Sequence, residues 1–418
     1  MPPIAIYAPR ILTPQEEIND GVIVVEGATI AALGHRDETR VPEGAIDYVA
    51  PGIVIPGFVD IHIHGAGGHD VMEASARALD KITATVARHG TTSIVATTVT
   101  APVDETCHSL AGIAKYIQAH EPQPPKKEGE ETPGPDGQEP QAEEAPPHEI
   151  PKVPPKLAAE ILGIHLEGPF ISKSKRGVHP PDAIVKPSLE LLHQFLEAAD
   201  GRVRIVTIAP ELPGALELIS AVVKAGMVAA LGHTDADYDQ ARAAIQAGAR
   251  HAVHTFNAMR AFNHRDPGIL GAVMTDPEVT AEVIADGVHV SGPAIQILIG
   301  TKGFDTVLLA SDATAATGMP DGHYRLGTTE VTVKGGVCQN SEGKLAGSTL
   351  TLDRALRFVV SLGAPLPEAV RMATILPARR LGLAGKKGIL APGADADIVA
   401  LTPDLRVAGV MTRGVGLV

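Results

Sequence analysis

The sequence is poor in the residues that mark several classes of protein. Its 418 residues include no tryptophan, and aromatic side chains make up 3% of the chain. The two cysteines, Cys107 and Cys338, are too few for a disulfide framework or a cysteine-rich zinc site. No stretch approaches the roughly 20 uninterrupted apolar residues of a membrane span, and the first residues lack the basic start and apolar core of a signal peptide. We therefore expect a cytoplasmic protein without a membrane partner.

Positive charge is also scarce. The chain has 35 lysines and arginines against 49 aspartates and glutamates, which gives a formal net charge of -14. Non-specific binding of nucleic acid needs clustered basic residues that replace counterions, so we expect no nucleic-acid partner. A small anionic substrate is not excluded, because a local site can oppose the overall sign of the charge.

Hydrophobic residues make up 44% of the chain and supply a large core. Residues 1–56 and 386–418 share a texture of short β-type runs broken by glycine, aspartate and proline. We expect these two ends to pair into one small β-sandwich domain.

Between the ends, over residues 57–385, strand-like and helix-like stretches alternate, which indicates parallel strands. The expected strands, the first of which starts just before this region, are 53–61, 92–99, 159–166, 202–209, 227–231, 251–254, 280–285 and 306–310. Helical patterns such as 74–89, 188–199, 235–247 and 293–301 separate them, and a hairpin is expected at 330–337. Eight alternating units predict an α/β fold of the (β/α)8 TIM-barrel type, with its chemistry at the carboxyl ends of the strands. A doubly wound open sheet is the alternative.

One segment interrupts the alternation of strands and helices. Residues 121–156 are rich in proline and glutamate and have almost no apolar residues before position 150. Such a composition cannot bury enough surface to offset the entropy of ordering. We expect a solvated insertion in the barrel domain, with a partner-binding role as the alternative.

Residues that can bind a metal follow several of the expected strands. In ILGIHLEGPF, a buried run at 161–164 leads to Glu167 at a turn formed by Gly168 and Pro169. In PGFVDIHIHG, His62 and His64 alternate along a strand and therefore point to one face. His233, His254 and Asp312 end the fifth, sixth and eighth strands. Because the carboxyl ends of barrel strands meet at one mouth, these residues together predict a metal site.

Three neighbouring residues are expected outside this set of ligands. Asp60 shares the face of His62 and could orient it, His69 is read as a loop residue, and His251 starts its strand and is read as structural, on the opposite side of the barrel.

The pattern of HxH after strand one, histidines after strands five and six and an aspartate after strand eight resembles the amidohydrolase superfamily. Many members carry a lysine on strand four that bridges two metals, but here that strand reads RIVTIAPE and the acid comes instead from HLEGPF. Together with GVHPP, LGHTDA, HTFNAM, RDPG, ADGVHV and SDAT, the chain resembles the N-acetylglucosamine-6-phosphate deacetylase family over nearly its whole length.

This resemblance implies a role for each residue of the metal site. Glu167, His233 and His254 would be the principal ligands, and His62 and His64 match positions that hold a second metal in some members. One or two divalent ions per subunit, of zinc, iron, manganese or cobalt, are therefore expected. Asp312 would be the general base toward the attacking water and would then pass the proton to the leaving amine.

The resemblance also implies the contacts of a phosphorylated amino sugar. His179 and His289 match positions that contact the sugar and the reacting amide. Asn257 and Ala258 would offer amide hydrogens to the phosphate, and Arg265 would offer its guanidinium. In relatives this arginine can come from a neighbouring subunit, which implies a homodimer.

Two other readings stay open at this point. One is a different amidohydrolase, such as a dihydroorotase-like or isoaspartyl-dipeptidase-like hydrolase, which the missing strand-four lysine opposes. The other is an inactive relative kept as a binding or scaffold protein, which the complete set of ligands opposes.

Overall fold

The computed structural model describes residues 2–121 and 157–417, so nearly all of the expected insertion at 121–156 lies outside the described residues. The larger part of the chain forms a barrel of eight parallel strands, paired in the order of the sequence. The strands are β6 (Phe58–Ile63), β9 (Thr91–Thr98), β10 (Glu160–Glu167), β11 (Val203–Ile208), β12 (Val228–Leu231), β13 (His251–Ala252), β14 (Thr280–Val283) and β15 (Val307–Leu309). A bridge between Ile63 and Ala313 joins the first strand to the segment after the last. The expected (β/α)8 barrel is thus confirmed, and the open sheet is excluded.

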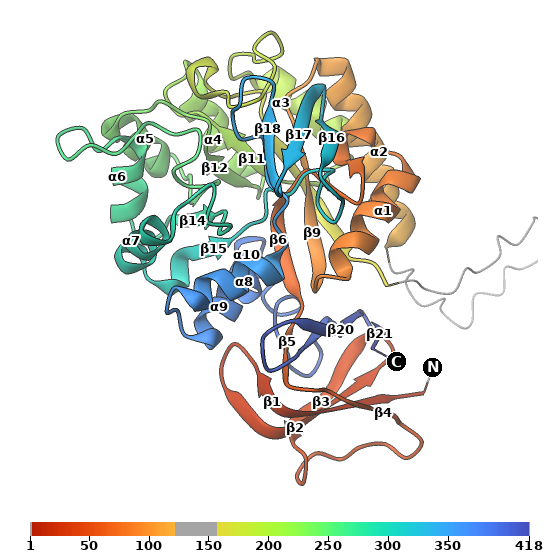
Figure 1. Ribbon diagram of the computed structural model, residues 1–418. Helices are drawn as coiled ribbons and strands as arrows, with labels where there is room; N and C mark the ends of the chain where they lie inside the picture. Colours follow the sequence, from red (N-terminus) through yellow and green to blue (C-terminus); the bar gives the residue numbers. More distant parts are fainter. Residues whose placement is uncertain (1, 122–156, 418) are drawn as a thin grey trace, which may run out of the picture.

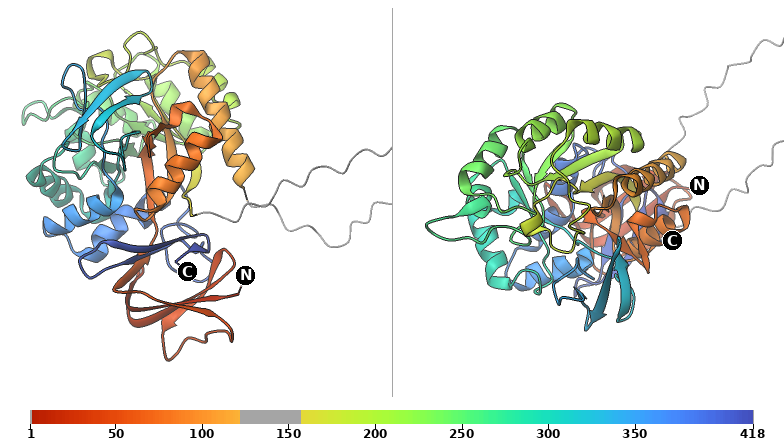
Figure 2. Two further views of the ribbon diagram at one scale, coloured as in Figure 1. Left: turned by 45° about the vertical axis from the view of Figure 1, so that its right-hand side comes forward. Right: turned by 90° about the horizontal axis from the view of Figure 1, so that it is seen from above.

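Helices surround this barrel (Figures 1 and 2). They are α1 (Ala76–Ala87), α2 (Val103–His120), α3 (Leu189–Ala198), α4 (Ala215–Lys224), α5 (Tyr238–Gln246), α6 (Gly268–Thr275), α7 (Gly292–Lys302), α8 (Leu352–Ser361), α9 (Leu366–Ala373) and α10 (Ile375–Arg380). Helix α1 shows how the sequence determines where a helix starts and which face it buries. Ser75 caps its first turn, and Leu79, Ile82 and Val86 recur at helical spacing and are buried. Within the described residues, no helix has the length and apolar character needed to cross a membrane.

Both ends of the chain contribute to a second sheet below the barrel (Figure 1). It contains β1 (Ile4–Leu12), β2 (Glu17–Glu26), β3 (Thr29–His35), β4 (Ile46–Val49), β5 (Ile53–Pro56), β19 (Ile398–Leu401), β20 (Val407–Thr412) and β21 (Val415–Gly416). Strands β5 and β19 pair antiparallel and join the two ends of the chain. The sheet has a core of its own, in which Ile6 and Ile23 pack with Ile398 and Met411. The chain ends therefore form a separate small β domain.

The first expected barrel strand, 53–61, is two strands in two different sheets. Strand β5 belongs to the small domain and β6 to the barrel, and the chain changes sheet at Gly57. A side chain at Gly57 would overlap that of Thr92 on β9, so the crossing depends on a residue without one. Pro56 and Gly57 interrupt the apolar run at this point and are the signal that marks the break.

A three-stranded sheet covers one side of the barrel mouth (Figure 1). It consists of β16 (Gly322–Leu326), β17 (Thr329–Lys334) and β18 (Val337–Asn340), where a single hairpin at 330–337 was expected. The turn between β16 and β17 is held by hydrogen bonds from Gly327 N to Asp70 Oδ2 at 2.8 Å and from Thr329 Oγ1 to Val178 O at 3.1 Å.

Candidate metal centre

The mouth of the barrel contains a cluster of buried histidines and carboxylates. Each member ends a barrel strand or follows it closely, where (β/α)8 barrels present their chemistry. The cluster consists of His62 and His64 at the end of β6, Glu167 at the end of β10, His233 after β12, His254 after β13 and Asp312 after β15. None of the six is more than 9% exposed.

Glu167 lies in the middle of this cluster. Its Oε1 is 3.0 Å from His254 Nε2, 3.2 Å from His233 Nε2 and 3.3 Å from His62 Nε2. Its Oε2 is 3.2 Å from His64 Nε2. One carboxylate therefore faces the Nε2 atoms of four imidazoles that come from three strands.

The opposite ring nitrogen decides the protonation of each Nε2. In all four histidines, Nδ1 donates to an oxygen that can only accept. The acceptors are Glu282 Oε2 for His62, Thr97 O for His64, Lys175 O for His233 and Asn257 O for His254, at 2.9, 3.1, 2.9 and 3.2 Å. In the neutral form of each ring the single N–H is on Nδ1, so each Nε2 can present a lone pair to an ion at the centre.

Acceptors crowded in this way repel one another unless a cation lies among them. The Nε2 atoms of His233 and His254 are 3.1 Å apart, and the buried Nε2 of His62 has no hydrogen-bond partner among the described residues. Imidazole nitrogens and carboxylate oxygens are ligands that zinc, iron, manganese and cobalt accept. The residues present therefore fit a divalent metal.

The pKa values of the residues in the cluster also indicate that this site stabilises positive charge. Burial alone would lower the pKa of His64, but its hydrogen bonds to Asp312 and Glu167 raise it to about 9. Burial opposes the charge of His62 as well, yet Glu167 and Glu282 raise its pKa well above the usual range. Burial would raise the pKa of Glu167, but the neighbouring His62 and His233 hold it well below its usual range. The carboxylates thus stay ionised, and the positive charge that they stabilise is either a proton on His62 and His64 or a bound cation in its place.

His179 lies against the same centre but differs from the other histidines. Its Nδ1 accepts a hydrogen bond from Thr100 N at 3.2 Å, so the proton of the neutral ring is on Nε2. That Nε2 is 3.6 Å from Glu167 Oε2. Burial and the charge of His233 lower the pKa of His179 to about 4, which keeps the ring neutral. Although its distances would allow a metal, His179 offers the centre an N–H and not a lone pair.

Asp312 contacts the cluster at the two histidines of β6. Its Oδ1 is 3.1 Å from His64 Nε2 and 3.8 Å from His62 Nε2. Burial would raise the pKa of Asp312, but the hydrogen bond to His64 and the charges of His62 and His64 lower it. The carboxylate is therefore ionised at neutral pH and able to accept a proton.

Backbone strain accompanies these residues. Asp312, His233 and His254 have positive φ angles of 49°, 47° and 29°, which residues with side chains rarely adopt. Such conformations cost about 1–3 kcal/mol each and persist where the surroundings enforce them, commonly at functional sites.

His289 is the second histidine that was expected to contact the sugar. The side chain of His289 is 6% exposed, and it donates from Nδ1 to Asp286 Oδ2 at 2.7 Å. Burial lowers the pKa of His289, but the bond to Asp286 and the charges of Asp286 and Asp312 raise it. The Nδ1–H of His289 is therefore occupied by Asp286, and its Nε2 is the ring nitrogen left for a substrate.

The expected phosphate contacts lie in the segment after His254. The main-chain N–H of Asn257 already donates to His254 O at 2.9 Å, whereas its side-chain Nδ2 is buried without a partner among the described residues. Ala258 has a φ of 50°, and its carbonyl accepts from Thr234 N at 3.0 Å. Arg265 is exposed, away from the buried cluster.

Glu282 is part of the site but was not expected from the sequence. It lies on β14, is fully buried, and binds both His62 and His251. An acid inside the apolar run of TAEVIA is the signal that could have identified it. His251 was expected to lie apart from the centre, but it is connected to His62 through Glu282. Asp60 accepts from the main-chain N–H groups of His62 and Ser311 at 3.3 Å, so it holds the backbone and not the imidazole ring.

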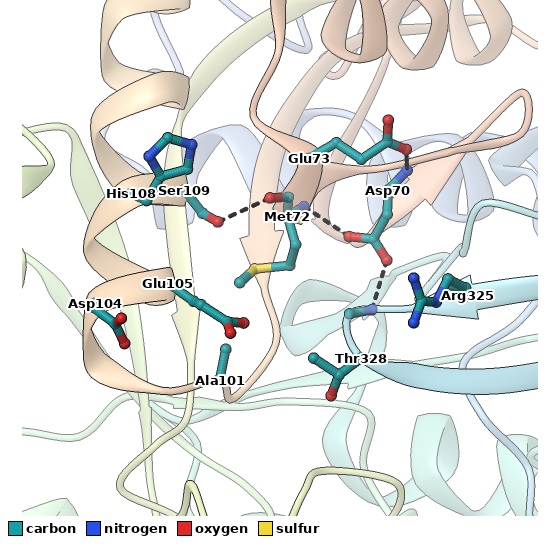
Figure 3. A pocket seen from close by; sticks show the side chains of 11 residues that line it. Asp70, Met72, Glu73, Ala101, Asp104, Glu105, His108, Ser109, Arg325 and Thr328 are labelled. Atoms are coloured by element: carbon teal, nitrogen blue, oxygen red, sulfur yellow. Dashed lines mark hydrogen bonds between the residues drawn. The ribbon is translucent and has the colours of Figure 1, made fainter.

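A separate pocket of about 510 Å³ opens between η1 (Val71–Glu73), α2 and the turn after β16 (Figure 3). It contains none of the residues of the metal cluster. Asp70, Glu73, Asp104 and Glu105 line it, against the single guanidinium of Arg325. This acidic lining does not suit a phosphate, so the pocket is not where a phosphorylated substrate would bind. His69 was expected in a loop but lies in the short strand β8 (His69–Asp70), with Nδ1 3.0 Å from Glu73 Oε2 and outside the metal cluster.

Comparison with known proteins agrees with this geometry. The model of the amidohydrolase family matches residues 53–126 and 156–416. The chain is 37% identical to the N-acetylglucosamine-6-phosphate deacetylase of Vibrio furnissii, covering 97% of this chain and 93% of the relative. It is 35% identical to the N-acetylgalactosamine-6-phosphate deacetylase of Escherichia coli O157:H7, covering 98% of both.

A solved structure gives the same result. The structure of a mutant N-acetyl-D-glucosamine-6-phosphate deacetylase from Mycobacterium smegmatis, in complex with N-acetyl-D-glucosamine-6-phosphate, superposes with a TM-score of 0.86 at 36% identity and covers 100% of both chains. The chain therefore belongs to the N-acetylglucosamine-6-phosphate deacetylase family of the metal-dependent amidohydrolases.

Proposed function

We propose that this enzyme hydrolyses N-acetyl-D-glucosamine 6-phosphate to D-glucosamine 6-phosphate and acetate, in the catabolism and recycling of amino sugars. The observation that carries the proposal is the meeting of four imidazole lone pairs around Glu167, with the ionised Asp312 beside them. Membership of the deacetylase family gives the substrate class. A cytoplasmic location and the absence of a nucleic-acid partner stay predictions.

Two groups of ligands share Glu167. We assign one ion to Glu167, His233 and His254 and a second to His62 and His64, with zinc, iron, manganese or cobalt as candidates. When bound, the metal supplies Lewis-acid chemistry, because it polarises the acetyl carbonyl and lowers the pKa of water.

Asp312 moves the proton of the reaction. As water adds to the acetyl carbon, an Oδ atom of Asp312 takes one of its protons. Breaking of the C–N bond then gives acetate and an amine, to which Asp312 returns the proton. The lowered pKa of Asp312 suits this role, because the carboxylate is free to accept at neutral pH.

Two histidines orient the reacting amide. The Nε2–H of His179 points toward the centre and can donate to the acetyl oxygen as negative charge develops there. His289 is held by Asp286 through Nδ1 and can contact the sugar through Nε2.

The phosphate would lie beyond His254. The unpartnered Nδ2 of Asn257 and the main chain at Ala258 are the donors that this chain offers. Arg265 and Phe262 are both exposed, and we assign the guanidinium of Arg265 to the substrate of a second subunit in a homodimer.

The test is amine release from N-acetylglucosamine 6-phosphate and from unphosphorylated N-acetylglucosamine, by metal-loaded enzyme. Strong preference for the phosphorylated sugar would support the proposal, and equal rates would refute the phosphate contacts. N-acetylgalactosamine 6-phosphate belongs in the same assay, because one similar relative carries that name.

A further inference from the structure

Glu282 is a charged residue in the interior of the barrel. Its side chain is 0% exposed on β14. Its Oε2 accepts from His62 Nδ1 at 2.9 Å and from the main-chain N–H of His254 at 3.3 Å, and its Oε1 is 2.7 Å from His251 Nε2. One carboxylate thus contacts both expected groups of metal ligands without facing the metal cluster itself.

The contacts continue below Glu282. His251 Nδ1 is 2.7 Å from Thr280 Oγ1, and Thr280 Oγ1 is 3.2 Å from the carbonyl of Arg250. His251 and Glu282 are both fully buried. A chain of buried polar groups therefore runs from His62 through Glu282 and His251 to Thr280.

Burying these polar groups costs hydration free energy, so packing alone does not explain why they are there. A buried carboxylate loses several kcal/mol of hydration, and an aliphatic residue would fill the same space without that loss. What Glu282 adds is control of His62: by accepting from Nδ1 it fixes the ring, places the lone pair on Nε2 and makes that nitrogen more basic. Partners of this kind typically change metal affinity 10- to 100-fold in other proteins.

We propose that Glu282, supported by His251 and Thr280, is a positioning residue that makes His62 a metal ligand. An ion held by His62 and His64 depends on this carboxylate, whereas the ion held by Glu167, His233 and His254 depends on it much less, because His254 contacts Glu282 through its main chain and not through its ring. The inference rests on the proposed metal site but not on the identity of the substrate.

The experiment is metal binding by the full-length enzyme without any sugar. Stripped protein is dialysed against buffers of fixed free Zn²⁺, and the metal per subunit is measured by atomic emission. We expect the wild type to bind two ions, and Glu282→Gln to bind one of them normally and the other about 10- to 100-fold more weakly. A Glu282→Gln variant that titrates like the wild type would overturn the inference, as would a wild type that takes up a single ion.

Two further variants make the result specific. Asp353→Asn removes another buried acid, which pairs with Arg357 on α8 outside the centre, and should leave zinc binding unchanged. If Glu282→Gln fails to fold, Thr280→Val decides: weaker binding of one ion supports the inference, and an unchanged titration overturns it. An enzyme that binds two ions but releases no amine would refute the proposed function and leave this inference intact.

Discussion

Two kinds of histidine meet at the mouth of this barrel, and the partner of Nδ1 distinguishes them. His64 and His254 donate from Nδ1 to main-chain carbonyls and present lone pairs to the centre, whereas His179 accepts at Nδ1 and presents an N–H. The same side chain therefore serves as ligand or as donor, according to the backbone group that lies behind it.

This difference predicts opposite results for two substitutions. His179→Asn should keep the metal but lose about 100- to 1,000-fold in kcat, because a donor to the developing oxyanion is removed. His233→Asn should instead lose metal, since it removes a lone pair beside Glu167. Metal content measured together with kcat checks both, and loss of metal in His179→Asn would show that His179 is a ligand.

Asp312 offers the second prediction at this scale. Asp312→Asn should keep its metal and lose about 100- to 10,000-fold in kcat, because an amide cannot accept the proton of the attacking water. The exposed acid Asp305 provides a control, and Asp305→Asn should leave kcat unchanged. Near-normal turnover by folded Asp312→Asn would remove it as the general base.

At the scale of the elements, the ends of the strands position the functional side chains, and the turns that follow orient them. Gly168 follows Glu167 with a φ of 79°, and a Cβ there would overlap Thr100 Oγ1. Thr100 in turn holds His179, with Oγ1 2.7 Å from Nδ1. The turn after β10 therefore links the acid of one strand to the donor beside it.

Gly168→Ala should consequently lower both stability and activity. Gly201 is the matched control, because it has a φ of 68° but open space around a Cβ. Gly201→Ala should cost about 1 kcal/mol of unfolding free energy from backbone strain, and Gly168→Ala clearly more, from strain and the clash with Thr100. Equal losses in thermal unfolding would contradict the role of this clash.

The sequence predicted most elements that carry the site, because the determining signals are local. Alternation places His62 and His64 on one face, and the glycine and proline after Glu167 mark a strand end. Glu282 was missed because its partner His62 is 220 residues away and the two meet when the barrel closes. The break between β5 and β6 was missed although Pro56 and Gly57 mark it, because the apolar residues on both sides suggest a single strand.

At the scale of the whole molecule, a buried cation connects the barrel with the small domain. Lys387 Nζ lies 2.8 Å from Asp395 and 2.9 Å from Asp397, and it also binds Glu160 on β10. Its side chain is 4% exposed. The three carboxylates gather from both parts of the chain around this one ammonium group.

Lys387→Met should therefore lower the unfolding free energy by about 3–5 kcal/mol, because the buried carboxylate of Asp397 loses its partner. Burial already raises the pKa of Asp397 against the pull of Lys387, and removing the cation would raise it further. A carboxyl group whose pKa is raised by folding destabilises the folded protein as the pH rises through that pKa. The loss of unfolding free energy in Lys387→Met should therefore be larger at pH 7 than at pH 4. Denaturant unfolding at both pH values measures this, with the exposed Lys386→Met as the control; equal stability of both variants would show that Lys387 is dispensable.

The most direct test of the whole assignment is release of acetate and amine from N-acetylglucosamine 6-phosphate by enzyme stripped of metal and then reloaded. We predict that stripping lowers turnover by more than about 100-fold, because Lewis-acid stabilisation is worth several kcal/mol. Reloading with zinc, iron, manganese or cobalt should restore equal amounts of both products. Stripped enzyme that works at the full rate would contradict a metal-dependent deacetylase.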